Sequence, residues 1–198
     1  QSLETNGFQL TIDVSADIAA NAVLNATGGS VVSVTAGSVN VDGSLTLSSS
    51  TLDVFATLTN LSGVLTLQNN STLNASLVLN QSQGTLEMQG GDTSANDSSL
   101  LSVINAAVIN EGLLRVTSGR DDHSILQVTG GLVNTGQIEL TQFSTTSSRV
   151  SRSTLEVEGG SLVNELGGQI RVVAGAGTGE RLITAELDNR GTIQVAAG

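Results

Sequence analysis

The sequence predicts an all-β fold, a parallel β-solenoid in which the chain coils through about nine short rungs stacked on one another. Three observations lead to this fold class. One strand pattern recurs along the chain, an Asn and then a Gly precede most of its copies, and the apolar residues are almost all aliphatic. We expect residues 1–198 to form a single β-solenoid domain. We also expect a fragment of a longer protein, since Gln1 is neither an initiator methionine nor the start of a signal peptide.

The repeat is clearest in the second half of the chain. Residues 126–140 and 155–172 each contain an apolar-x-apolar pair, a Gly-rich corner, a Leu two positions before an Asn, a Gly, and a second apolar-x-apolar pair. Residues 101–116 and 183–195 follow the same order. A period of roughly 20–50 residues indicates one supersecondary unit per repeat, and alternation with a period of two indicates half-buried strands.

Each rung is expected to have three short strands. In the copy at 126–140, the apolar stretches are Leu126/Val128, Leu132 and Ile138/Leu140. Three strands per turn predict a triangular coil with three parallel sheets, and the aliphatic side chains stack inside it because an isolated rung cannot bury them. The strand after the Asn-Gly corner is expected at Leu10/Ile12, Leu45/Leu47, Leu65/Leu67, Leu86/Met88, Leu114/Val116, Ile138/Leu140, Ile170/Val172 and Ile193/Val195.

Two other folds fit the sequence less well. No segment has apolar residues at the i, i+3, i+4 spacing of an amphipathic helix, and Gly, Ser, Thr, Asn and Val are poor helix formers. A β-sandwich also has short alternating strands. A Greek key, however, gives no reason for the same Asn-Gly corner to precede one strand type in each copy.

Composition narrows the possible functions. The chain has three phenylalanines and no Tyr, Trp or Cys, so its core cannot rest on aromatic rings or disulfides. No apolar run reaches the ~18 residues of a membrane span. With 18 acidic residues, seven arginines and no lysine, the net charge of −11 argues against binding nucleic acid or anionic lipid. No cofactor is expected.

The repeated corner residues are expected to have structural roles. Asn tolerates the left-handed backbone region, and Gly supplies a positive φ without strain. Asparagines at the same corner of every rung would stack about 4.8 Å apart, and their amides could hydrogen-bond along the stack as a ladder. The predicted ladder consists of Asn60, Asn80, Asn110, Asn134, Asn164 and Asn189, and Asn40, Asn25 and Asn6 occupy the same slot more loosely. Asn25, Asn60 and Asn80 also lie in Asn-x-Ser/Thr sequons, which a Ser/Thr-rich sequence produces readily.

A second column is predicted on the outer face of the strands that follow the corner. Its members are Thr11, Thr46, Thr66, Glu87, Arg115, Glu139, Arg171 and Thr192. From Glu87 onward the charges alternate in sign, and each exposed pair contributes only about 0.2–1 kcal/mol. A slip by one rung would place like charges together, so we expect this column to help fix the register.

Rung length varies mostly at one corner, through inserts at 89–99, 117–124, 141–153 and 173–181. Loops on a rigid scaffold often bind partners, so we expect a binding edge made of Arg120, Asp121, Asp122, His123, Arg149, Arg152 and Arg181. Residues 120–123 also combine an Arg, two carboxylates and the sole His, as a catalytic site could. A solvated turn is the preferred explanation of these residues, so no catalytic residue is assigned. Calcium could bind Asp92/Asp97 or Asp121/Asp122, but no calcium-loop motif is present, and no metal site is predicted.

The run from Gly131 to Leu140, echoed around Asn110, Asn164 and Asn189, resembles a repeat of bacterial surface β-helix proteins. These are the autotransporter passengers and filamentous-haemagglutinin-like exoproteins, with rungs of the form Leu-x-Asn-x-Gly-x-Ile-x-Val. The Asn column is similar to the asparagine ladder of pectate-lyase-type helices. The resemblance covers residues 50–196 well and 1–49 loosely. It implies a right-handed parallel β-helix and a secreted or cell-surface location.

Three functions are compatible with these features. The first is a structural or adhesive segment of an extracellular or cell-surface protein, whose loop edge binds a protein or glycan partner. The second is a carbohydrate-active enzyme, a polysaccharide lyase or hydrolase, that uses residues 121–123. It is disfavoured because no Trp or Tyr could stack on a sugar. The third is an ice-binding face built on Thr11, Thr46 and Thr66, which is disfavoured because the column becomes charged after three rungs.

Overall fold

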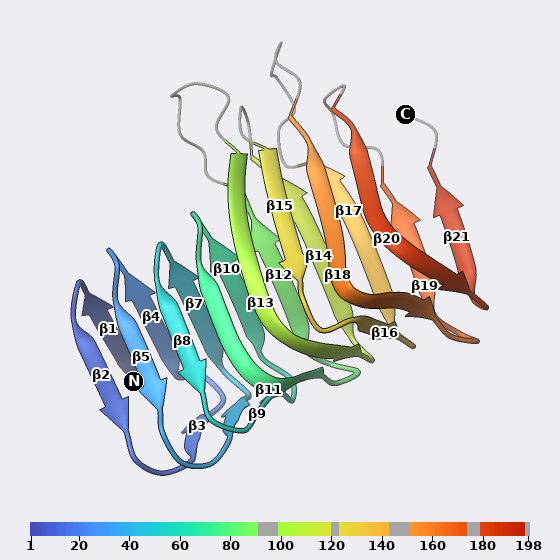
Figure 1. Cartoon of the computed structure of the whole chain (residues 1–198). Coiled ribbons are helices and arrows are strands. Elements are labelled where there is room, and N and C mark those ends of the chain that lie inside the picture. Colours follow the sequence, from blue (N-terminus) through green and yellow to red (C-terminus); the bar gives the residue numbers. More distant parts are fainter. Residues whose placement is uncertain (91–98, 120–122, 143–150, 174–178, 197–198) are drawn as a thin grey trace.

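The computed structural model of the chain describes residues 1–90, 99–119, 123–142, 151–173 and 179–196. The strands in these residues coil into a parallel β-solenoid (Figure 1). The coil has about seven turns, slightly fewer than the nine rungs that the repeat predicts. The described residues form no helix, and hence none that is long and apolar enough to cross a membrane.

The coil is built from two sheets rather than the three predicted. The first sheet has nine strands, which are β1 (Ser2–Asn6), β4 (Val23–Thr27), β7 (Ser44–Ser48), β10 (Val64–Gln68), β12 (Thr85–Gln89), β14 (Leu113–Ser118), β17 (Gln137–Gln142), β19 (Gln169–Val172) and β21 (Thr192–Val195). The second sheet has twelve strands, which are β2 (Gln9–Ile12), β3 (Ala16–Ile18), β5 (Val31–Val34), β6 (Val39–Val41), β8 (Thr51–Val54), β9 (Thr57–Asn60), β11 (Thr72–Asn80), β13 (Ser99–Asn110), β15 (His123–Val128), β16 (Leu132–Asn134), β18 (Ser153–Asn164) and β20 (Arg181–Asn189).

A bend in the second sheet explains this difference. In the first three rungs the two strands on either side of the bend are separate, as in β2 and β3. In β11, β13, β18 and β20 they merge into one long strand, and the register shifts at the bend, for example between Asn74 and Leu77. An irregularity of this kind bends a strand while the pairing continues on both sides of it. Three apolar stretches per rung therefore form only two sheets.

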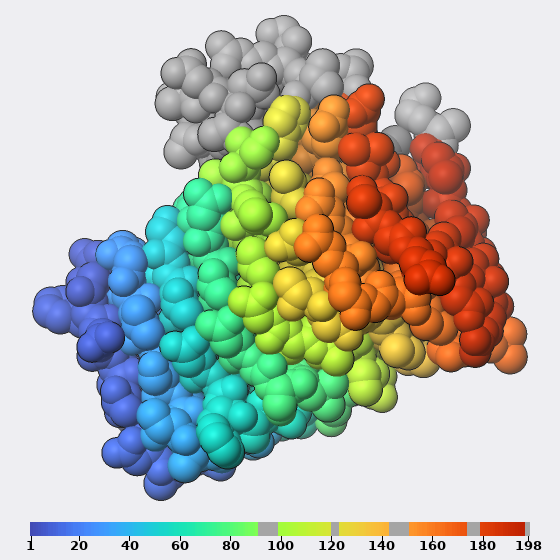
Figure 2. Space-filling view, viewed as in Figure 1, coloured from blue at the N-terminus to red at the C-terminus, as the bar shows by residue number. Residues whose placement is uncertain are grey.

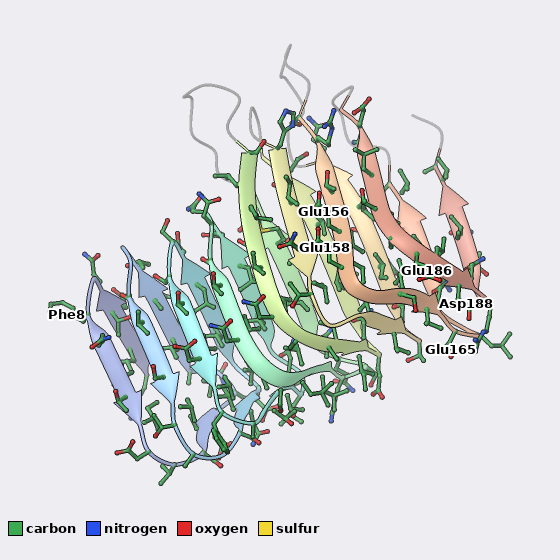
Figure 3. All side chains as sticks on the ribbon, in the orientation of Figure 1. Phe8, Glu156, Glu158, Glu165, Glu186 and Asp188 are labelled. Carbon is green, nitrogen blue, oxygen red and sulfur yellow. The ribbon has the colours of Figure 1, made fainter. Side chains whose placement is uncertain are left out.

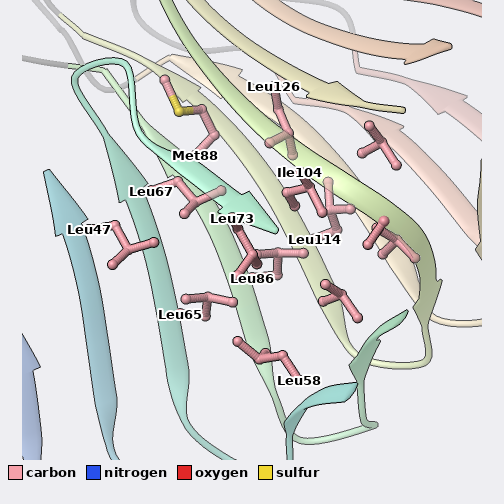
Figure 4. Packing of buried hydrophobic residues seen from close by; sticks show 14 of the residues in the cluster. Leu47, Leu58, Leu65, Leu67, Leu73, Leu86, Met88, Ile104, Leu114 and Leu126 are labelled. Atoms are coloured by element: carbon pink, nitrogen blue, oxygen red, sulfur yellow. The ribbon is translucent and has the colours of Figure 1, made fainter. Parts of the chain in front are cut away.

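The interior of the coil holds columns of aliphatic side chains (Figure 4). In the first sheet Leu65, Leu86 and Leu114 pair in register and are completely buried. Leu73 and Ile104, also completely buried, stack in the same way on the second sheet. Each side chain is covered by the rungs above and below it, so burial depends on stacking rather than on any single rung.

The outward column of the first sheet differs from the prediction at both ends. Thr11 lies in β2 together with Leu10 and Ile12, and β2 pairs with β5 of the second sheet. Thr46 lies in β7 of the first sheet, so the two threonines are not in one column. At the other end Gln194, and not Thr192, pairs with Arg171. Alternation with a period of two identifies a strand without showing which sheet it joins. The pair Asn6-Gly7 before this strand imitates the corner, although Asn6 lies in β1 of the first sheet.

The asparagine slot begins later than predicted. Val41 pairs with Asn60, so an aliphatic residue fills the slot in the preceding rung. Asn40 lies one position earlier and faces outward, where its Nδ2 donates a hydrogen bond to an exposed carboxylate. Asn6 and Asn25 lie in β1 and β4 of the first sheet, and so belong to another face.

The corner glycines are required for close approach and not for the positive φ that the sequence suggested. Neither Gly112 nor Gly136 has a positive φ, and the ladder asparagines have none either. A Cβ atom on Gly112 would clash with the carbonyl oxygens of Gln81 and Gly84, and one on Gly136 would clash with that of Gly112. Only glycine lets successive corners stack at the strand spacing.

We expect Gly136→Ala to lower the free energy of unfolding by about 1–3 kcal/mol, the usual cost of overpacking, because the new methyl group must push two rungs apart. Urea unfolding measures the change. Thr135→Ala is the matched control, since Thr135 is an exposed residue of the same corner. Equal stability of the Gly136→Ala variant and the parent chain would contradict the close packing of the corners.

Candidate functional site

The ladder asparagines form one buried column. Each Nδ2 donates to the Oδ1 of the next Asn at 2.7 or 2.8 Å, from Asn60 through to Asn189. The second N–H bonds a backbone carbonyl, as from Asn80 Nδ2 to the oxygen of Leu113 at 3.0 Å. Asn60 Oδ1 is buried without a partner among the described residues, since Val41 precedes it. The column has no solvent access apart from its Asn189 end, so it holds the rungs together and cannot bind a ligand.

The burial of the ladder also decides whether two of the three sequons can be glycosylated. Asn60 and Asn80 are completely buried within the ladder, so an oligosaccharyl group cannot be attached to either in the folded chain. Asn25 is partly exposed on the first sheet and is the only one of the three that solvent reaches.

A second internal column was not predicted from the sequence. It consists of serines at the corner between the two sheets, namely Ser30, Ser50, Ser71 and Ser102, all of them buried. The N–H groups of Ser50 and Ser71 donate to the Oγ of the serine in the next rung, at 3.4 and 3.2 Å. A serine directly before β5, β8 and β11 was the available signal, and Ser102 takes the equivalent place inside the longer β13. Its role is structural, since buried polar groups need such partners.

The loop edge that the sequence predicted as a binding surface is described only in part. His123, Arg152 and Arg181 are described, whereas Arg120, Asp121, Asp122 and Arg149, together with Asp92 and Asp97 of the suggested calcium sites, lie outside the described residues. The three described residues lie at the starts of β15, β18 and β20, which begin side by side at one edge of the coil (Figure 1). The fold therefore brings these three together.

The two arginines of this edge that the structure describes, Arg152 and Arg181, contact neighbouring groups of the chain. Arg152 forms an ion pair with Glu180 at 2.6 Å. Arg181 donates to the carbonyl of Gly179 and, at 3.4 Å, to Oε1 of Gln142. Burial lowers the pKa of the Arg181 guanidinium below its ordinary value. The edge thus combines positive and negative groups that are already partly paired.

A buried polar layer lies beneath the edge. Gln142, Ser118 and Ser151 are nearly inaccessible, Gln142 Nε2 donates to Ser151 Oγ, and the Oγ atoms of Ser118 and Ser151 are 3.3 Å apart. Ser118 and Gln142 continue the inward alternation of their strands, so they replace aliphatic residues there. Their hydrogen bonds link neighbouring rungs and fix the strand ends from which the inserts leave.

The charge column is in register as predicted from Glu87 to Arg171, with Glu87, Arg115, Glu139 and Arg171 on neighbouring strands. The Nε of Arg115 donates to Oε1 of Glu139 at 2.8 Å. The Arg115 side chain is 34% exposed and that of Glu139 13% exposed. The pair lies on an open sheet face, so it stabilises the register more than the fold.

A double-mutant cycle with Arg115→Ala and Glu139→Ala is expected to give a coupling energy of about 0.2–1 kcal/mol, because the pair is partly solvated. The coupling should fall when the urea titrations are repeated at high salt, since ions screen exposed charges. A coupling that is zero at low salt would show that the contact adds nothing to stability.

Comparison with known proteins assigns the chain to no family. No family model matches the chain, and neither a curated protein nor a solved structure shows significant similarity to it. Within the described ranges, no three His, Asp or Glu side chains come together in a group that could hold a metal ion. The functional argument therefore rests on the surfaces of the coil.

Proposed function

We propose that the chain is a structural segment of a secreted or cell-surface protein, a stretch of rod on which further β-solenoid rungs stack. The loop edge would then bind a partner at the cell surface. The observation that carries the proposal is the open, apolar character of both ends of the coil.

The C-terminal end presents an uncovered core. Ile193 is 46% exposed and Val195 72% exposed, whereas Ile170, the neighbour of Ile193 in the preceding rung, is 1% exposed. Among the described strands, β20 and β21 have a neighbour on one side only. Figure 2 shows the rungs as successive bands that run to this end. Unpaired strand edges and uncovered aliphatic columns favour pairing with another strand.

The other end is open in the same way. Leu3 of β1 is half exposed, although the leucine that follows it in the column, Leu24, is partly covered, and the next, Leu45, is completely buried. Leu3 and Ile193 thus occupy the two ends of one aliphatic column, and both are uncovered. A coil with uncapped ends is suited to a repeating rod, since stability then comes from each contact between neighbouring rungs.

Other features support an extracellular role. The chain resembles the repeats of bacterial surface β-helices, and the resemblance extends to its lack of cysteine and its few aromatic residues. The edge with His123, Arg152 and Arg181 supports the adhesive part of the proposal, because it joins charged side chains on a rigid scaffold. The alternative of a polysaccharide lyase or hydrolase depends on Asp121 and Asp122, which lie outside the described residues, so no observation favours it.

Adding a rung tests the stacking role. A copy of residues 49–68, which contains β8, β9 and β10, is inserted after Val195, so that its Asn60 equivalent can accept a hydrogen bond from Asn189. We expect the free energy of unfolding to rise by on the order of 2 kcal/mol, because the insert covers the exposed core of the last rung. In the control insert, the equivalents of Leu52, Leu58 and Leu65 are replaced by Ser. Equal stability of both extended chains and the parent would rule out a stacking end.

The adhesive part requires a separate experiment. Beads coated with the chain are tested for attachment to a cell monolayer, and the double variant Arg152→Gln/Arg181→Gln is expected to attach several-fold less. The matched control is Arg115→Gln/Arg190→Gln, which removes the same charge from β14 and from the corner directly after β20, both outside the loop edge. Attachment no greater than that of uncoated beads, or equal for the two double variants, would refute a binding role of the loop edge.

A further inference from the structure

A groove runs across the outer surface of the second sheet, beside its bend. It has a volume of about 590 Å³ and crosses four rungs, from β5 to β13. The residues that matter for its chemistry are Ser33, Asp53, Phe55, Asn74 and Asn105, with Val34, Val54 and Ala75 also in the lining. The groove is shallow and open, and its lining mixes polar side chains with aliphatic ones and the ring of Phe55.

One side of the groove is a polar ladder. Asp53, Asn74 and Asn105 lie in register on neighbouring strands. Asn74 Nδ2 donates to Asp53 Oδ1 at 2.6 Å, and Asn105 Nδ2 donates to Asn74 Oδ1 at 2.7 Å. Unlike the internal asparagines, these side chains are partly or fully exposed. Each amide uses one N–H along the ladder and keeps the second, while Asp53 keeps one carboxylate oxygen. One acceptor and two donors therefore follow one another at the strand spacing of about 4.8 Å.

Phe55 provides an apolar surface in the same groove. It directly follows β8, and its backbone N–H bonds the carbonyl of Val34 at 2.9 Å, which fixes its position. The ring is 75% exposed, so it contributes little to the core. An exposed ring beside an array of donors and acceptors is the combination that binds a sugar, whose C–H face packs on the ring while its hydroxyls bond the polar groups.

The charge of the groove restricts the ligand further. Residues 1–114 contain no Lys or Arg, so no cation of this half of the chain offsets Asp53. Asp13 adds a second carboxylate nearby, where it accepts a hydrogen bond from Thr35 of the groove lining. An acidic saccharide would be repelled by this field, whereas an uncharged one would not.

We propose that this groove binds an uncharged oligosaccharide, with Phe55 as the stacking ring and Asp53, Asn74 and Asn105 as the partners of its hydroxyls. The groove is a second surface, separate from the loop edge, so this proposal goes beyond the adhesive role proposed for that edge. It also revises the expectation from composition, which discounted sugar stacking because Trp and Tyr are absent. Phenylalanine serves here because the corner after β8 leaves its ring uncovered.

Titration calorimetry with cellohexaose, maltohexaose and mannohexaose as uncharged probes, and hexagalacturonate as the acidic probe, tests the proposal. We expect at least one uncharged probe to bind and hexagalacturonate to bind at least tenfold more weakly. Phe55→Ala should weaken binding at least tenfold, and Phe55→Trp should tighten it because the larger ring offers more surface. Phe8→Ala is the matched control, since Phe8 is 69% exposed, does not line the groove, and precedes β2 at the end of that strand remote from the bend (Figure 3).

The proposal is overturned if no uncharged probe binds, if hexagalacturonate binds as tightly, or if Phe55→Ala binds as well as Phe8→Ala. Urea unfolding of both variants checks that each remains folded, and only small changes are expected because both rings are exposed. Failure of sugar binding would leave the added-rung and bead-attachment results unchanged, so it is distinguishable from failure of the structural and adhesive role.

Discussion

Replacing Asn110 with alanine is expected to lower the free energy of unfolding by roughly 2–6 kcal/mol, because two buried polar groups each lose a partner at about 1–3 kcal/mol. The groups are Asn80 Nδ2, which donates to Asn110, and Asn134 Oδ1, which accepts from it. No water reaches either of them, since Asn80, Asn110 and Asn134 are completely buried. Urea unfolding at neutral pH gives the difference.

The matched control for this prediction is Asn189→Ala. Asn189 ends the ladder and is exposed, so water can take the place of its bond to Asn164. Its loss should cost no more than about 1 kcal/mol. If the two substitutions destabilise the chain equally, burial does not give the ladder its strength and the explanation offered for it is wrong.

Truncation in the aliphatic column is the second large effect. We expect Ile138→Ala to cost about 2–5 kcal/mol, because the side chain is completely enclosed and leaves a cavity between rungs. Ile193→Ala removes the same group from the same column at the open end, where the side chain is 46% exposed. It should cost clearly less, since less apolar surface returns to water.

Urea unfolding of the Ile138→Ala and Ile193→Ala variants measures both losses, and it can also contradict the account. Ile138 and Ile193 are both in the first sheet, linked through Ile170 by strand pairing. An equal loss at the two positions would mean that the last rung is covered in solution. In that case the open end, on which the proposed function depends, would not exist.

The alignment of the rungs is predicted best where an Asn and a Gly mark the corner between the second and the first sheet. The Asn-Gly corner aligns the rungs from Asn60 onward, so the order of the asparagine ladder and of the charges from Glu87 to Arg171 follows from spacing alone. Before Asn60 the slot holds an aliphatic residue, Val41, which cannot be told from any other core position. This is why Asn40 and Thr11 were placed in the wrong columns.

Other features depend on geometry that a sequence pattern does not contain. The sequence cannot show that the corner glycines are close contacts, because a Gly at a turn suggests a positive φ equally well. The merging of two strands in β11 follows from a register shift that leaves alternation intact on both sides. The groove beside Phe55 depends on an uncovered corner, and composition alone suggested no role for that ring.

Amide hydrogen exchange along the native chain tests the central claim, an open-ended coil stabilised rung by rung, most directly. The account predicts the slowest exchange in the middle rungs, from β10 to β17, and progressively faster exchange toward β1 at one end and β20 and β21 at the other, because the end rungs have one neighbour only. Equally slow exchange in β21 and β14 would contradict the account, since it would show that the last rung is already covered.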